Sequence, residues 1–575
     1  MNLVEDNSGF IRRLFLRHVW SGVAAQIVST IGPVACGVIA GSVFGKTGLA
    51  VTGLYAPFFF LAAFFGTIIA GGSSTLAAKY IAQDDNRRVA GIYTLAMVLS
   101  TVCAAALFII GMLLQSSVLT VITGSGELLE AASRYYVPAL LYTSLTVILF
   151  MPLFWARLMG RSSVALILTL LLTGASIAFG VLFIFGIGTG LEGLAYAQAL
   201  ATGLALVISL LILHLPKNGL RLCKLSYIRE DIIALAATGS PPGLSRLYRF
   251  LSLFLLNIIL LNAGGPETVA VFSVLNMLLR FVTALANGIS GVQIPIASVL
   301  CEERDTCSLR QLSRMVFTFG NTLIIIAAAL MLIFNQTIAA VFGADGSVFF
   351  PVMVCFCVYI LFYLNGNLFV SWYTAIRKVK LANILTFAQD MVFPPLLAVL
   401  FTLQDSYTVW LYLPAAGLLT GLLLIITYRK GVRNTDTGAG STETGGVALA
   451  FSVGRDALKA GQASAAVSEF CEGQGFAVKQ TMLLSMAIEE LIILMAEQNE
   501  GSGDISVRLS CFDGGTILRL RDAGRKFNPL QYYKTRYTDD IEDSIGLMGL
   551  KYITESAEVV YYRETFGVNN LVVII

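Results

Sequence analysis

Four ionisable side chains lie inside strongly apolar stretches of this 575-residue sequence: Arg246, Arg249, Arg280 and Asp390. An ionised side chain at the centre of a membrane-spanning helix costs roughly 2.5–3.5 kcal/mol on insertion scales, so each of these residues needs a compensating role. Arg246 and Arg249 are three residues apart and therefore share one helical face. The pattern predicts a buried Arg–Asp network that lines a central cavity, in which Asp390 accepts a proton or a cation. A structural ion pair, or arginines that extend to the lipid headgroups, is the alternative interpretation.

The charge balance of this group bears on the substrate. Two or three cations stand against one acid, and this balance favours an anionic substrate over an organic cation. The apolar stretches before residue 235 are nearly free of ionisable residues.

Membrane-spanning helices are the elements that must position these residues. Hydrophobic residues make up 57% of the sequence and charged residues only 13%, about half the roughly 25% of an average soluble chain. A surface that faces lipid explains this composition. The net charge of +3 gives no basic field, so we expect no nucleic-acid partner.

A helix needs roughly 20 mostly apolar residues to cross a bilayer. Twelve such stretches are present, at 20–42, 51–78, 90–113, 135–155, 163–187, 190–214, 235–262, 268–299, 314–334, 348–375, 380–402 and 408–428. Lysine and arginine concentrate in alternate loops, and this asymmetry predicts a multi-pass plasma-membrane protein with both termini in the cytoplasm.

Similar motifs recur at an offset of about 220 residues. Gly71–Lys79 and Gly291–Ser298 each precede a charged turn, and Val121–Glu127 and Val341–Gly346 each precede an apolar run. Because six helices per half is an even number, the halves would share one topology, related by an axis along the membrane normal. We therefore expect an all-α polytopic membrane protein with twelve transmembrane helices in two six-helix repeats, followed by a soluble α+β sandwich domain. The expected divisions are 1–220, 221–430, a linker at 431–446, and 447–575.

Four short motifs identify a family that the first 430 residues resemble. They are Gly71-Gly-Ser73, Gly190–Ala197, Gln293-Ile-Pro295 and Val409–Pro414. In their order and spacing they resemble the multidrug and toxic compound extrusion (MATE) transporters. The resemblance implies export of small organic compounds or drugs from the cytoplasm, driven by inward flow of sodium ions or protons. It implies neither a catalytic residue nor a bound metal, and it adds Gln293 to the expected transport residues.

The first spanning helix departs from the pattern of this family. Many members carry an Asp there for the coupling cation, whereas Gln26–Cys36 contains no acid. Gln26, Ser29 and Thr30 offer neutral oxygens instead, and hydrogen bonding between helices is the alternative role for them. Flippases of lipid-linked anionic substrates share the wider superfamily and give a second candidate function, although they typically resemble a fourteen-helix arrangement.

The pattern changes after the Gly-rich segment Gly431–Gly446, which we interpret as a linker. Strands are expected at 447–453, 505–512, 516–521, 558–563 and 570–575, and helices at 455–471, 479–498 and 546–556. This order predicts helices layered on one mostly antiparallel sheet.

Three motifs in this region resemble the histidine-kinase and gyrase-type ATP-binding fold, in its anti-sigma-factor kinase branch. The residues that carry the resemblance are Glu490, Asp522, Gly524, Gly546 and Gly549. It implies that ATP or ADP binds there, with Asp522 accepting from the adenine amino group and Gly524 allowing the ring to approach. The glycine pair would lie near the phosphates, where backbone N–H groups attract anions.

Two departures separate this region from an active ATPase. Leu494 stands where the family carries its magnesium-binding Asn, and an apolar side chain cannot coordinate a hard cation. Ser544 replaces the first Gly of the Gly-rich box. The chain also lacks a Gly-x-x-x-x-Gly-Lys-Ser/Thr motif. We therefore expect a nucleotide-sensing or protein-binding module and no motor that powers transport. The alternative is a membrane signalling protein that uses this domain as an anti-sigma-type regulator. A sensor kinase is excluded because His18 and His214 are the chain's histidines, and both lie at the ends of membrane helices.

Overall fold

The protein divides into two compact units. A computed structural model describes residues 8–81, 85–123, 127–159, 162–214, 223, 228–302, 305–342, 346–402, 408–438, 448–454, 457–498, 504–512, 515–522, 524–525, 527–536, 550–551, 554–555, 557–565 and 568–574. The larger unit comprises Ser21–Ser290 and Thr318–Tyr428, and it is helical. The smaller unit comprises Met1–Trp20, Gly291–Phe317 and Arg429–Ile575.

Helices account for nearly all of the described residues before residue 439. They are α1 (Ser8–Gly66), α2 (Gly72–Ile81), α3 (Asn86–Leu113), α4 (Gln115–Thr123), α5 (Glu127–Leu158), α6 (Ser162–Val181), α7 (Glu192–His214), α8 (Ile228–Glu302), α9 (Thr306–Ile333), α10 (Asn335–Phe342), α11 (Gly346–Ala375), α12 (Val379–Phe387), α13 (Phe393–Thr402) and α14 (Tyr412–Gly438). Short π-helical or 3-10 turns connect some of them: η1 (Thr67–Gly71), η2 (Leu182–Ile187), η4 (Ala388–Val392) and η5 (Thr408–Leu411). Within the described residues, ten helical segments are long and apolar enough to cross a membrane.

Two of these ten segments are long enough to cross twice. Helix α1 has 59 residues and α8 has 75, so at 1.5 Å per residue each exceeds twice the roughly 30 Å hydrocarbon core of a bilayer. Each is interrupted by glycine: Gly45 in α1 has φ 57° and ψ −145°, and Gly265 in α8 has φ 68°. These backbone angles are strained for residues with a Cβ atom, so glycine allows the break.

The helix boundaries repeat along the chain. Helices α3 and α9 begin at Asn86 and Thr306, and the short helices α4 and α10 begin at Gln115 and Asn335. Both pairs therefore have the same 220-residue offset, and the motif repeat in the sequence coincides with a repeat of secondary structure.

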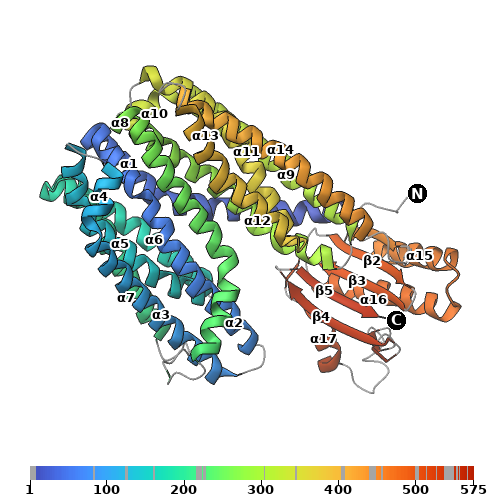
Figure 1. Ribbon diagram of the computed structural model, residues 1–575. Helices are drawn as coiled ribbons and strands as arrows, with labels where there is room; N and C mark the ends of the chain where they lie inside the picture. Colours follow the sequence, from blue (N-terminus) through green and yellow to red (C-terminus); the bar gives the residue numbers. More distant parts are fainter. Residues whose placement is uncertain are drawn as a thin grey trace. The chain divides into compact units, whose positions relative to one another are not determined.

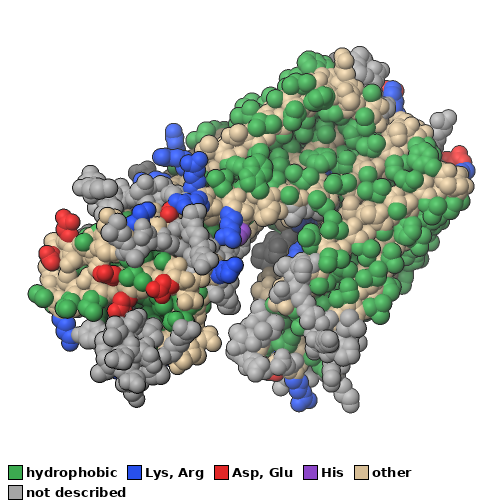
Figure 2. Space-filling view, turned by 180° about the vertical axis from the view of Figure 1, so that it is seen from behind, with side chains coloured by type: hydrophobic (Ala, Val, Ile, Leu, Met, Phe, Trp, Pro, Cys, Tyr) green, Lys and Arg blue, Asp and Glu red, His purple; other side chains and the backbone are tan. Residues whose placement is uncertain are grey.

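Apolar side chains cover the outer surface of the larger unit. On the face that Figure 2 shows, apolar side chains are spread over its helices, with few charged side chains among them. Large apolar residues there are strongly exposed, such as Val102 at 60%, Phe185 at 65% and Leu422 at 54%. Exposure of this extent costs free energy in water and none in lipid, so the surface is that of a polytopic membrane protein.

Five strands form one antiparallel sheet in the C-terminal region (Figure 1). They are β1 (Ala448–Gly454), β2 (Asp504–Phe512), β3 (Gly515–Asp522), β4 (Val559–Thr565) and β5 (Val568–Ile574), in the order β1-β2-β3-β5-β4. Helices α15 (Ala457–Gly473), α16 (Val478–Gln498) and α17 (Pro529–Arg536) accompany it. All five strands lie within two residues of their expected positions. The expected helix at 546–556 lies largely outside the described residues.

Alternating apolar residues join this sheet to its helices. Val507 and Leu509 of β2 and Leu518 and Leu520 of β3 are fully buried, and they share one core with α15 and α16. Because side chains alternate across a strand, the residues between them face the opposite side of the sheet. Helix α14 continues to Gly438, into the segment expected as a linker.

Candidate functional site

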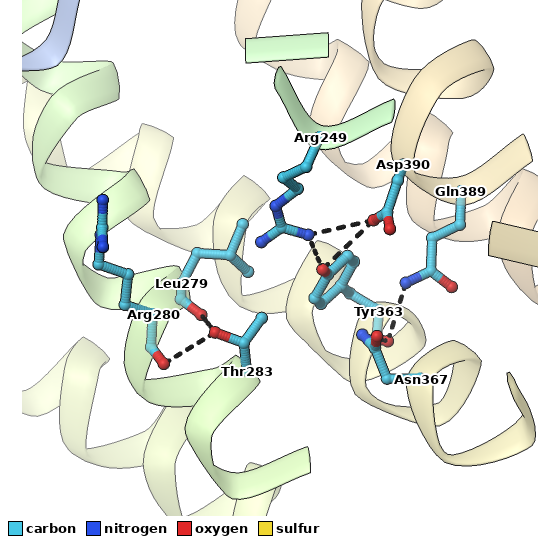
Figure 3. A network of polar contacts seen from close by, with 8 residues as sticks. All are labelled: Arg249, Leu279, Arg280, Thr283, Tyr363, Asn367, Gln389 and Asp390. Atoms are coloured by element: carbon cyan, nitrogen blue, oxygen red, sulfur yellow. Dashed lines mark hydrogen bonds and ion pairs between the residues drawn. The ribbon is translucent and has the colours of Figure 1, made fainter. Parts of the chain in front are cut away.

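Asp390, Arg249 and Tyr363 form a polar network within the apolar helices of the larger unit (Figure 3). Arg249 Nη1 donates to Asp390 Oδ1 at 3.1 Å, and the Tyr363 hydroxyl donates to the same oxygen at 3.3 Å. Arg249 also contacts the Tyr363 hydroxyl directly, and its guanidinium lies 5.2 Å from the centre of the Tyr363 ring. The exposed fractions of the Arg249 and Asp390 side chains are 16% and 11%, so the ion pair is largely shielded. The expected Arg–Asp network is thus present in the structure for these two residues.

A local distortion of the helix carries Asp390. Residues Ala388–Val392 form the π-helical turn η4 between α12 and α13. Such turns break the regular backbone hydrogen bonding and recur at functional sites. The neighbouring Gln389 is buried and donates to the Tyr363 carbonyl at 3.3 Å, while Asn367 donates to the same carbonyl at 2.9 Å. These contacts fix Tyr363, which the sequence-based argument missed. An aromatic hydroxyl within an apolar helix was the available signal.

Arg280 lies apart from the ion pair, on the other side of the region in Figure 3. Its guanidinium lies 5.7 Å from the centre of the Phe59 ring and 6.0 Å from that of Phe60. The Phe60 ring is shared, because Arg249 lies 5.8 Å from its centre. Among the described residues, no carboxylate lies within 4.0 Å of the Arg280 nitrogens. Cation–π contacts contribute about 0.5–2 kcal/mol, less than the roughly 2.5–3.5 kcal/mol cost of placing an arginine at mid-membrane.

The remaining expected transport residues do not join the hydrogen-bonded network. Arg246 is on the same helix as Arg249 and its side chain is exposed, but its charge interacts electrostatically with Arg249 and Asp390. Gln293 is fully buried in α8 and belongs to the smaller compact unit. In the first helix, the Thr30 hydroxyl donates to the carbonyl of Ile27 at 2.7 Å. This bond lies within one helix, as is common for hydroxyl side chains in helices.

Two cavities lie beside these charged residues. The larger, of about 230 Å³, is lined by residues of α1, α5, α6, α7 and α8, including Tyr55, Tyr142, Asn276 and Arg280. The smaller, of about 40 Å³, is lined by Arg249 and Asp390. Asn276 lines both, so one α8 side chain separates or connects them. We refer to them as the Arg280 cavity and the Asp390 cavity.

One of the expected nucleotide residues of the C-terminal region, Asp522, belongs to a buried hydrogen-bonded group. Asp522 ends β3 and is fully buried, and its Oδ2 accepts from Asn569 Nδ2 at 3.5 Å. Asn569 Oδ1 in turn accepts from the Tyr562 hydroxyl at 2.6 Å and from the Phe527 backbone at 3.2 Å. Asn569 therefore positions Asp522, and the motif comparison did not identify it.

The other expected nucleotide residues have mixed outcomes. Glu490 on α16 accepts from the Leu550 backbone at 3.1 Å. Leu494 is 7% exposed and part of the apolar core, so the side chain at the magnesium-ligand position is packed against carbon. Gly524 is described, whereas Gly546 and Gly549 lie outside the described residues.

A buried carboxylate joins the sheet to the turn between α8 and α9 within the smaller unit. Asp305 is 1% exposed and caps α9 by accepting from the Ser308 backbone at 3.1 Å. It also pairs with Arg508 of β2 and lies 3.7 Å from Arg521 of β3. Burial lowers the pKa of Arg521 to about 10, which leaves it cationic at neutral pH. Arg521 is adjacent to Asp522, so β3 presents one residue to Asp305 and the next to the opposite side of the sheet.

Comparison with known proteins finds the same fold in MATE family transporters. Residues 23–182 match the family model MatE. An inward-facing multidrug resistance MATE family transporter of the MOP superfamily is 20% identical, with a TM-score of 0.67 over 72% of this chain and 96% of that chain. The outward-facing conformation of a multidrug resistance MATE family transporter gives a TM-score of 0.59 at 19% identity, over 74% and 97% of the two chains.

A third solved structure is a MOP superfamily transporter from Pyrococcus furiosus Vc1 (DSM3638). The reverse polarity of its binding pocket suggests a different function for that protein. The match has a TM-score of 0.60 at 19% identity and covers 76% of this chain and 98% of that chain. No curated protein matches the chain.

The helical region therefore has the fold of MATE transporters, and its first part also matches the MatE family in sequence. The matched segment ends at residue 182, so the resemblance of residues 447–575 to an ATP-binding fold stays a prediction.

Proposed function

We propose that this protein is a secondary active transporter that exports a small organic solute from the cytoplasm in exchange for sodium ions or protons. Its twelve crossings would arise from ten helical segments, two of which cross twice, and both termini would be cytoplasmic. The observation that carries this proposal is the ion pair of Asp390 and Arg249 on a π-helical turn beside a cavity, in a MATE fold.

The geometry suggests how coupling would work. The same Asp390 oxygen accepts from both Arg249 and Tyr363. A proton or sodium ion that binds this carboxylate competes with both donors, because it neutralises the charge that attracts them. Binding would therefore loosen α8 and α11 from η4 and shift the transporter toward its other conformation.

Transport by the purified protein in vesicles tests this proposal. An imposed sodium or proton gradient should drive dye or drug flux, and the ion whose gradient drives flux identifies the coupling ion. Flux without any gradient dependence would contradict secondary transport. Movement of a lipid-linked anion between leaflets, with no flux of soluble compounds, would favour the flippase instead.

We propose a regulatory role for the C-terminal domain, with ATP or ADP bound at Asp522 and no role as an energy source. Two contacts support it. Asp522 is held by Asn569 inside the domain, and the adjacent Arg521 lies by Asp305 at the start of α9. A nucleotide that shifts the end of β3 would alter this contact with the turn between two membrane helices. A protein partner of the same surface is the alternative ligand.

Calorimetry on the full-length protein separates these roles. ADP or ATP should bind to the wild type, and Asp522→Ala should remove the binding, whereas Glu497→Ala, at an exposed position of α16, should retain it. Undetectable binding at millimolar nucleotide would leave the protein-binding role, and rapid magnesium-dependent hydrolysis would refute the argument from Leu494.

The Asp305 contact has its own test. Asp305→Asn keeps the side-chain volume and a capping oxygen but removes the charge that attracts Arg508. It should leave nucleotide affinity unchanged while abolishing any effect of nucleotide on flux. If nucleotide alters flux equally in both proteins, this contact does not carry the regulation.

A further inference from the structure

The Arg280 cavity combines a large volume with a single sign of charge. Its volume is about 230 Å³. Among the described residues that line it, Arg280 is the one that carries a charge at neutral pH. No aspartate or glutamate contributes to the described lining. A cationic ligand would therefore meet a like charge and find no carboxylate there.

The neutral polar groups of this cavity do not replace Arg280 as charge-recognising donors. The hydroxyls of Thr143, Thr169 and Ser176 each donate to a carbonyl one turn earlier in their own helix, at 2.7–2.9 Å. The Tyr55 hydroxyl likewise donates to the Ala132 carbonyl at 2.9 Å. These hydroxyls present lone pairs to the cavity. The amides of Gln198 and Asn276, which also line it, can donate hydrogen bonds, but of the described lining residues Arg280 is the one that offers a positive charge, so recognition of a negative charge depends on its guanidinium.

Arg280 differs from Arg249 in what balances it. Arg249 has Asp390 and Tyr363, whereas the partners found for Arg280 among the described residues are neutral: the faces of Phe59 and Phe60 and, electrostatically, Tyr142. The Phe60 ring lies within 6.0 Å of both guanidinium groups, so the potential near Arg280 is raised further by Arg249. The aromatic surfaces around Arg280 also suit the apolar body of an organic ligand.

From this geometry we infer that the Arg280 cavity binds an organic anion, a water-soluble compound with an apolar or aromatic body and a carboxylate or similar group that pairs with Arg280. The inference rests on the proposed transport function and specifies its substrate class. Arg280 can form a bidentate, charge-assisted pair with such a group, and this pair would supply the counter-charge that the protein itself does not provide. Phe59, Tyr142 and Asn276 border the space that remains for the body of the ligand.

Three probes of matching size test this inference in the detergent-solubilised full-length protein: naphthalene-2-carboxylate, naphthalene-2-carboxamide and 2-naphthylmethylammonium. The carboxylate should bind at least about tenfold more tightly than the other two. A hydrogen bond between charged groups stabilises a complex more than a neutral one does, and the difference corresponds to about tenfold in affinity. Equal affinities, or preference for the ammonium compound, would overturn the inference.

Substitutions assign the preference to Arg280. Arg280→Gln should lower carboxylate affinity about tenfold or more while leaving carboxamide affinity within about twofold, and Arg280→Lys should restore part of the preference. Arg157→Gln is the matched control, because Arg157 also lies over a phenylalanine ring, at 5.9 Å from the centre of Phe154, but does not line the cavity. Unchanged carboxylate affinity in Arg280→Gln would contradict the assignment.

Two further results separate this inference from its alternatives. Binding of phosphatidic acid that depends on Arg280, without binding of naphthalene-2-carboxylate, would overturn the soluble-anion inference in favour of a lipid headgroup. Gradient-driven export of an organic cation such as ethidium, without carboxylate binding, would overturn the inference and leave the proposed transport function intact. Carboxylate binding that requires Arg280, without gradient-driven flux of the carboxylate, would support the site and contradict the transport function.

Discussion

The two arginines that lie near the Phe60 ring have opposite electrostatic surroundings. Arg249 is paired with a carboxylate and a tyrosine hydroxyl beside a cavity of about 40 Å³. Arg280 has aromatic faces and borders a cavity of about 230 Å³. An ion pair that is satisfied within the protein can respond to a proton or metal ion, whereas a cation without an internal carboxylate is suited to an external anion. The difference suggests that coupling and substrate recognition are assigned to separate cavities.

The largest expected effect is on coupling at Asp390. Asp390→Asn retains size and hydrogen bonding but cannot gain or lose a proton, so gradient-driven flux should fall to background. Stability should also fall, because Arg249 loses its carboxylate, but the protein that folds should still bind naphthalene-2-carboxylate, as measured by calorimetry on the purified variant. If the folded variant loses carboxylate binding together with flux, Asp390 is a structural partner of both cavities and the division between them fails.

Removal of the Arg249 charge should destabilise the protein more than any other single change in this region. Arg249→Gln leaves Asp390 buried without its cation, and breaking a buried pair in this way costs about 3–5 kcal/mol. The thermal unfolding midpoint should fall clearly. The double variant Arg249→Gln with Asp390→Asn should recover much of the loss, since neither charge is then left alone. Additive losses would show that the two residues do not interact.

Arg280→Gln should affect stability in the opposite direction. Because no described carboxylate balances Arg280, its replacement removes a desolvation cost and only cation–π contacts of about 0.5–2 kcal/mol. The unfolding midpoint without ligand should therefore stay constant or rise slightly. In saturating naphthalene-2-carboxylate, the wild type should gain stability and the variant should not. A large loss of stability without ligand would reveal an internal partner and remove the contrast with Arg249.

The smallest effect is expected from the Tyr363 hydroxyl. Tyr363→Phe retains the ring beneath Arg249 and removes one donor to Asp390, which should cost about 0.5–1.5 kcal/mol of stability. Flux should persist, with its pH or sodium dependence shifted, because one competitor for the Asp390 oxygen is gone. Unchanged ion dependence would indicate that Tyr363 only supports the packing of α11.

Local patterns in the sequence were sufficient for most of the described helices, for the five strands and for the identity of the charged residues. Membrane helices need a long apolar run, and strands need a period of two, so both can be recognised without knowledge of their neighbours. The five strands and the unusual positions of Asp390, Arg249 and Arg280 were accessible for this reason. The ion pair between α8 and η4 was expected because charges inside a membrane need partners.

Only the tertiary structure decided which charges are paired. Sequence reasoning grouped Arg246, Arg249 and Arg280 around Asp390, yet the structure pairs Arg249 with Asp390 and places Arg280 on a different cavity. The contacts of Tyr363 with Asp390 and Gln389 likewise join residues 26 or more positions apart in the chain. The same is true of the contacts of Asn569 with Asp522 and of Asp305 with Arg508. Such contacts arise from helix rotation, a π-helical turn and strand register, which are settled by packing over the whole molecule and leave no local sequence signal.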